Sequence, residues 1–139
     1  MTPQFLDRLD QTEREWTIAA LTYIAYADGE VVKAEKETIM SIFPRVPREQ
    51  LTSFMSKMQK KFQASGEFPL PPLQYASKHV KIELLQTLIE LSSADSDLSE
   101  HEKVKVHEIG KILEVEKDDI QKIIEAFETI VHIRKKYEA

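Results

Sequence analysis

The stretch Ala27-Asp28-Gly29-Glu30-Val31-Val32-Lys33-Ala34-Glu35 carries the fold prediction, because a similar stretch occurs 67 residues later (94 − 27). The second copy reads Ala94-Asp95-Ser96-Asp97-Leu98-Ser99-Glu100-His101-Glu102. Each copy places a carboxylate at the end of a predicted helix, another two residues later, and a third in the first turn of the next helix. We expect the apolar residue between them, Val31 or Leu98, to point into the core.

The apolar residues around these two turns match as well. Before and just after the turns the offset stays at 67, and further along it becomes 69 (120 − 51). Any two amphipathic helix pairs can be aligned, but here the turn residues match along with the apolar stripes. We therefore predict an internal two-fold repeat of helix, acidic turn, helix, turn and helix, whose halves pack around a pseudo-two-fold axis. The matched apolar pairs are Leu21/Leu88, Ile24/Leu91, Ile39/Val106, Ile42/Ile109, Leu51/Ile120, Phe54/Ile123, Met55/Ile124 and Met58/Phe127.

Apolar residues recur at helical spacing along the chain, and no stretch alternates like a strand. Glycine and proline residues separate the periodic segments. We predict an all-α fold, a single compact domain of about seven helices spanning residues 1–139. The repeat halves are about 12–63 and 73–136, joined by a connection at 64–72. The predicted helices are about 4–10, 12–27, 33–43, 47–63, 73–93, 100–113 and 118–136.

Two local features bear on packing. The connection from Phe68 to Tyr75 is unusually apolar and rich in proline. We expect it to lie across the core and close it; the alternative is a partner-binding strip of polyproline character. Gly110 lies inside a helical pattern, where it marks close packing or an early weakening of the helix.

Composition excludes several classes of function. The net charge of −5, from 19 basic and 24 acidic residues, argues against nucleic-acid binding by bulk electrostatics. The chain has no cysteine, so it has neither disulfides nor thiolate metal sites. Its longest mostly apolar run, Ile18 to Ala27, is far short of the roughly 20 residues that span a bilayer. The segment Met1–Asp7 lacks the pattern of a signal peptide, and we expect a cytoplasmic protein.

The acidic turns predict a cation site. A carboxylate at a helix C-terminus, such as Asp28 or Asp95, is disfavoured by the helix dipole, so a local hydrogen bond or a bound cation should offset it. Clustered oxygen ligands suit Ca²⁺, Mg²⁺ or Mn²⁺. The first turn matches the second half of an EF-hand loop, but Ile24 and Tyr26 stand where that loop needs ligands. We therefore reject a complete EF-hand and expect weak binding unless the other turn contributes ligands.

The segment Ala25-Tyr26-Ala27-Asp28-Gly29-Glu30-Val31, followed by Glu35, resembles the signature of the TerB tellurite-resistance family and its TerB-like relatives. The second acidic turn resembles the family's second motif, and the likeness covers roughly residues 12–131. It implies an all-helical domain that binds divalent metal and is associated with tellurite and other stress responses. Ser96 departs from the glycine that the family often has there. The implied metal ligands are Asp28, Glu30, Glu35, Asp95, Asp97 and Glu102.

The residues themselves leave alternatives open. Glu102 forms a Ser-x-x-Glu capping box with Ser99, which explains it without a metal. Glu35 has Val32 at the corresponding cap position, so the first turn is the better candidate. The other carboxylates could be plain solvated turn residues. His101 could add a nitrogen ligand and favour Zn²⁺ or Mn²⁺, and the two histidines His79 and His132 have no evident partners.

We therefore expect a TerB-like accessory protein that binds a divalent metal ion (Ca²⁺, Mg²⁺, Mn²⁺ or Zn²⁺) and acts in tellurite or stress response. The alternative is a protein-interaction module of the same fold that binds an unidentified protein and no metal. We expect no enzyme and no catalytic residue, because no phosphate loop, His-Glu-x-x-His pair or nucleophile elbow occurs. A metal-dependent hydrolase would need a deep pocket beside the carboxylates.

Overall fold

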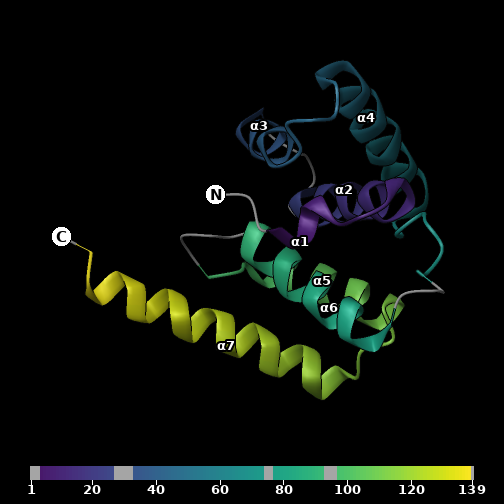
Figure 1. Cartoon of the computed structure of the whole chain (residues 1–139). Coiled ribbons are helices and arrows are strands. Elements are labelled where there is room, and N and C mark those ends of the chain that lie inside the picture. The colour runs from purple at the N-terminus through teal and green to yellow at the C-terminus, as the bar shows by residue number, and fades with distance from the viewer. Residues whose placement is uncertain (1–3, 27–32, 74–76, 93–96, 139) are drawn as a thin grey trace. The chain divides into compact units, whose positions relative to one another are not determined.

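The computed structural model of the chain describes residues 4–26, 33–73, 77–92 and 97–138 (Figure 1). Every regular element in these ranges is a helix, which confirms the all-α prediction. Six helices have ten or more residues, and α1 is a single turn of four, so the prediction of about seven full helices was one too many. The elements are α1 (Gln4–Asp7), α2 (Gln11–Ala25), α3 (Lys33–Ile42), α4 (Arg48–Ser65), α5 (Lys78–Ser92), α6 (Glu100–Ile112) and α7 (Lys117–Lys136).

The helices form two compact units, Met1–Pro71 and Pro72–Ala139. The division falls at the end of the predicted connection, residues 64–72. The first unit contains α1 to α4 and the second contains α5 to α7. The grouping of the whole chain into one domain remains a prediction. None of the described helices is both long and apolar enough to cross a membrane.

Helix α2 is the central helix of the first unit. A reciprocal capping box starts it: the Glu13 amide donates to Asp10 Oδ1 at 2.8 Å, and the Asp10 amide donates to Glu13 Oε1 at 3.0 Å. Every residue from Trp16 to Ile24 is buried. Helices α3 and α4 both pack against α2, which explains why its apolar surface is not restricted to one stripe.

The connection after α4 closes the core of the first unit. Helix α4 ends at Gly66, which has a left-handed backbone (φ 72°) that glycine adopts without steric cost. The chain then returns over α2, where the Phe68 ring centroid lies 5.2 Å from that of Trp16 and 5.6 Å from that of Tyr23. The Trp16 indole donates to the carbonyl of Pro71 at 3.0 Å. The prediction that this segment lies across the core is therefore confirmed for Phe68 to Pro71, while Gln74 and Tyr75 lie outside the described residues.

In the second unit α5 packs against α6 and α7, and α6 also packs against α7. Gly110 of α6 marks the closest approach. A Cβ atom added there would lie 2.5 Å from Cδ1 of Ile120 and 3.4 Å from Cδ2 of Leu85, which confirms the close-packing interpretation. Helix α5 begins at Lys78, later than the predicted residue 73. The Ser77 hydroxyl accepts from the Val80 amide at 3.2 Å and so caps this start.

The two units bury corresponding residues. Seven of the eight matched apolar pairs have the same degree of burial in both units; the exception is buried Ile24 against half-buried Leu91. The helix order also corresponds, with α2, α3 and α4 followed by α5, α6 and α7. These patterns are those expected of an internal repeat, which remains a prediction.

Candidate functional site

The six predicted ligands are described to different extents. Asp28, Glu30 and Asp95 lie outside the described residues. Glu35 lies in the first turn of α3, but its side chain is outside the description as well. The geometry of the candidate site therefore rests on Asp97 and Glu102, both from the second turn.

The second turn is anchored at Leu98 and Ser99. Leu98 is 4% exposed, which confirms the prediction that it points into the core. The Ser99 amide donates to Glu102 Oε1 at 2.8 Å, and the Glu102 amide donates to Ser99 Oγ at 3.1 Å. This capping box satisfies two amides at the start of α6, as predicted. One oxygen of Glu102 is therefore already engaged in holding the helix start.

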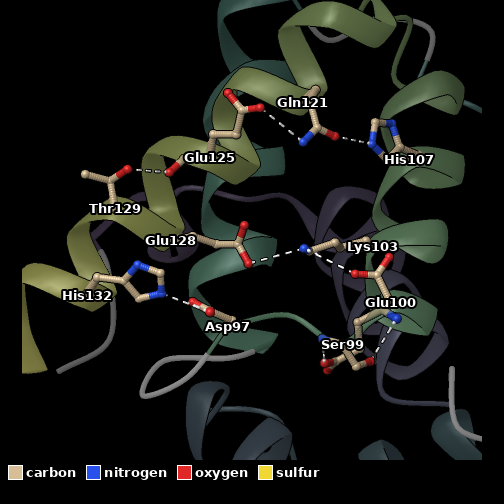
Figure 2. Close-up of polar contacts among 11 residues, drawn as sticks. Asp97, Ser99, Glu100, Lys103, His107, Gln121, Glu125, Glu128, Thr129 and His132 are labelled. Carbon is tan, nitrogen blue, oxygen red and sulfur yellow. Dashed lines mark hydrogen bonds and ion pairs between the residues drawn. The ribbon is translucent and has the colours of Figure 1, made fainter.

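Asp97 makes a contact that the sequence did not indicate. Its Oδ2 atom lies 2.9 Å from Nε2 of His132, which belongs to α7 and is 35 residues away (Figure 2). The side chains are 44% and 59% exposed, so this is a surface contact. The expectation that His132 and His79 lack partners was wrong, since His79 Nε2 lies 3.5 Å from Glu83 Oε1. Only the packing of α7 on α6 brings His132 to the turn, and no residue spacing reveals that packing.

A second ion-pair group ties α6 to α7 beside this contact (Figure 2). Lys103 Nζ lies 3.4 Å from Glu128 Oε2 and 3.6 Å from Glu100 Oε1. Burial lowers the pKa of Lys103, but the charges and hydrogen bonds of Glu128 and Glu100 oppose this and leave that pKa raised above its ordinary value. Lys103 therefore neutralises acidic charge close to the second turn.

A polar contact also joins the two helices further from the turn. His107 Nε2 lies 3.1 Å from Oε1 of Gln121, whose amide donates to Glu125 Oε1 at 3.3 Å (Figure 2). A shallow hollow of about 570 Å³ lies beside His107 and Gln121. Neither Asp97 nor Glu102 lines it, so it is not the pocket that a hydrolase built on the second turn would need.

The donor types suit a hard divalent cation, because carboxylate oxygens are the ligands that Ca²⁺, Mg²⁺ and Mn²⁺ prefer. Within the described ranges, however, no three acidic or histidine side chains gather closely enough to hold an ion. Asp97 has His132 beside it, and Glu102 is engaged in its capping box. A complete ligand set would therefore have to include carboxylates outside the described part of the chain, which are those of Asp28, Glu30, Glu35 and Asp95.

The family of this chain is shown by its match to a model of a known protein family. The model of the tellurite resistance protein TerB family matches residues 14–125. The chain belongs to the TerB family. The matched range includes both acidic turns and all six predicted ligands, and it runs from α2 into α7. Neither the curated proteins nor the solved structures gave a match.

Proposed function

We propose that this TerB-family protein is an accessory protein that binds a divalent cation through its two acidic turns. The family match across both turns supports this more than any other observation. The proposed ligands are Asp28, Glu30 and Glu35 in the first turn, with Asp95, Asp97 and Glu102 in the second. A link to tellurite or other stress, a cytoplasmic location and the absence of catalysis belong to the same proposal.

The two proposed half-sites are unequal. In the second, Glu102 caps α6 and Asp97 lies beside His132, so a cation there would compete with existing contacts. In the first, the sequence has Val32 at the position that corresponds to Ser99, so it offers Glu35 no Ser-x-x-Glu capping box. The first turn is therefore the stronger proposed site.

Oxygen ligands alone would favour Ca²⁺, Mg²⁺ or Mn²⁺. Zn²⁺ would need a nitrogen donor. The candidates are His132, which contacts Asp97, and His101, which follows the second turn in the sequence. The preferred metal therefore depends on whether a histidine binds it together with the carboxylates. Separate titrations with Ca²⁺, Mn²⁺ and Zn²⁺ distinguish these cases.

The test is a titration of metal-free protein followed by amide chemical shifts in NMR. We expect Ca²⁺ or Mn²⁺ to perturb amides near Asp28 first and those near Asp95 at higher concentration. Double substitution of Asp118 and Asp119 by Asn is the matched control, because these carboxylates lie in the first turn of α7, outside both acidic turns. If millimolar metal perturbs neither turn, the proposal is wrong.

The protein-interaction alternative drew on the apolar connection. Phe68 packs on Trp16 and Tyr23, and the carbonyl of Pro71 accepts from Trp16. These contacts direct the strip onto its own unit, so it offers less to a partner than its sequence indicated. Metal binding therefore remains the better-supported proposal.

A further inference from the structure

Each unit contains a hollow at a corresponding place. Arg14 is the fourth residue of the 15-residue helix α2, and Lys81 is the fourth residue of the 15-residue helix α5. Arg45 stands two residues before the N-cap of α4, as Glu114 does before the N-cap of α7. Arg14 and Arg45 line the first hollow, of about 270 Å³. Lys81 and Glu114 line the second hollow, of about 190 Å³.

In the second hollow, the cationic side chain of Lys81 is paired with a carboxylate of the same unit. The Lys81 side chain is only 8% exposed, and its Nζ atom donates to Glu114 Oε1 at 3.3 Å. Glu114 itself has a left-handed backbone, with φ at 62°. A buried ammonium group is costly unless it is paired, so the carboxylate at position 114 offsets the burial of Lys81.

The first hollow has the opposite charge at that position. Arg45, an exposed residue, stands where the second unit has Glu114, so two arginines line the first hollow. Among the described residues, neither guanidinium forms an ion pair with a carboxylate, although Asp7 lines the same hollow. Arg14 is half-buried, which limits its access to water. In the part of the chain that the structure describes, the first hollow therefore has no carboxylate paired with its cations, as Glu114 is paired with Lys81 in the second.

We propose that the first hollow binds the oxyanion of a small external molecule, a phosphate or a carboxylate, between Arg14 and Arg45. Guanidinium groups present forked donors that match both oxyanions in a bidentate way. The remaining lining includes Leu6, Ile42 and Phe43, which suits a ligand with a short apolar portion beside its charged group. This site is independent of the proposed metal function, since it uses neither acidic turn.

The test is an NMR titration of the full chain with inorganic phosphate and, separately, with acetate. We expect a saturable shift of the amides around Arg14 and Arg45, and the anion that saturates at lower concentration identifies the preferred chemistry. Arg14→Gln and Arg45→Gln should each remove the shift. Asp7→Asn should tighten binding about two- to fivefold, because it removes a like charge from the hollow.

The most discriminating variant is Arg45→Glu. It gives the first hollow the charge pattern of the second, so it should abolish anion binding while thermal stability stays equal or rises. Glu114→Gln is the matched control: it should leave the anion titration unchanged and lower stability. Unchanged shifts in Arg45→Glu or the absence of any shift in the wild-type protein would each overturn the proposal. So would shifts spread over the exposed lysines of α4, which are Lys57, Lys60 and Lys61.

Discussion

Nε2 of His132 lies 2.9 Å from Oδ2 of Asp97, so the C-terminal half of α7 contacts the end of the second acidic turn. This contact places an imidazole beside Oδ2, one of the two Asp97 oxygens that a cation could bind. His132 would compete with Ca²⁺ for Asp97, or it would join Asp97 as a nitrogen ligand of Zn²⁺.

The effect of removing the imidazole separates these roles. We expect His132→Ala to tighten Ca²⁺ binding at the second turn by about two- to fivefold, because an exposed contact of this kind contributes roughly 0.2–1 kcal/mol. Zn²⁺ binding should weaken instead, since zinc accepts imidazole nitrogen readily. Calorimetric titration with each metal measures both effects, and His79→Ala is the control. Equal affinities in wild-type protein and variant would contradict any role for His132.

Glu102 can be tested apart from its cap. Glu102→Gln keeps an acceptor for the Ser99 amide and removes the charge, so the metal-free protein should change in stability by no more than about 0.5 kcal/mol. Ser99→Ala should cost about 1 kcal/mol, because it removes the N-cap acceptor. Urea unfolding measures both. If Glu102→Gln also leaves metal affinity unchanged, Glu102 is a cap and not a ligand.

Gly110→Ala should destabilise the second unit by about 1–3 kcal/mol, a typical cost of overpacking. The added Cβ would lie 2.5 Å from Cδ1 and 2.8 Å from Cγ1 of Ile120. Chemical denaturation measures the loss, and Ile120→Val in the same chain should restore part of it by removing Cδ1. Gly66→Ala is a useful contrast, because it meets open space and its cost would come from the positive φ alone. A Gly110→Ala protein as stable as wild type would show that α6 and α7 lie further apart.

Lys103 should make stability depend on pH in the alkaline range. Its pKa is raised in the folded chain, so its ion pairs with Glu128 and Glu100 stabilise the fold fully below the ordinary lysine pKa. That contribution is lost as the pH rises through the raised folded value. Lys103→Gln should therefore lower the melting temperature at pH 7 and converge on wild type at strongly alkaline pH. A difference that stays constant with pH would contradict this account.

The parts of the fold that depend on local chemistry were predictable. The apolar spacing predicts all six long helices, along with a seventh where α1 has only one turn, and the Ser-x-x-Glu pattern predicts the capping box of Ser99 and Glu102. A glycine inside a helical pattern indicates either close packing or an early weakening of the helix, and the structure shows close packing at Gly110. The helices and the capping box have their causes within a few residues of the effect, whereas the neighbours of Gly110, Ile120 and Leu85, lie on other helices.

The remaining features depend on tertiary packing or on backbone detail. His132 reaches Asp97 only because α7 packs on α6, and one amphipathic helix does not reveal which partner surface it meets. The single turn of α1 was predicted as a longer helix, because short apolar patterns do not fix where a helix ends. The start of α5 was predicted too early, since Leu73 is buried without being helical.

The central claim, that the acidic turns bind a divalent cation, is tested most directly by calorimetry of Ca²⁺ and Mn²⁺ binding to metal-free protein. Wild type is compared with two variants, Asp28→Asn with Glu35→Gln and Asp95→Asn with Asp97→Asn. We predict saturable binding to wild type, its loss or a weakening of at least tenfold in the first variant, and a smaller weakening in the second. Binding that is absent from wild type, or equal in all three proteins, would contradict the claim.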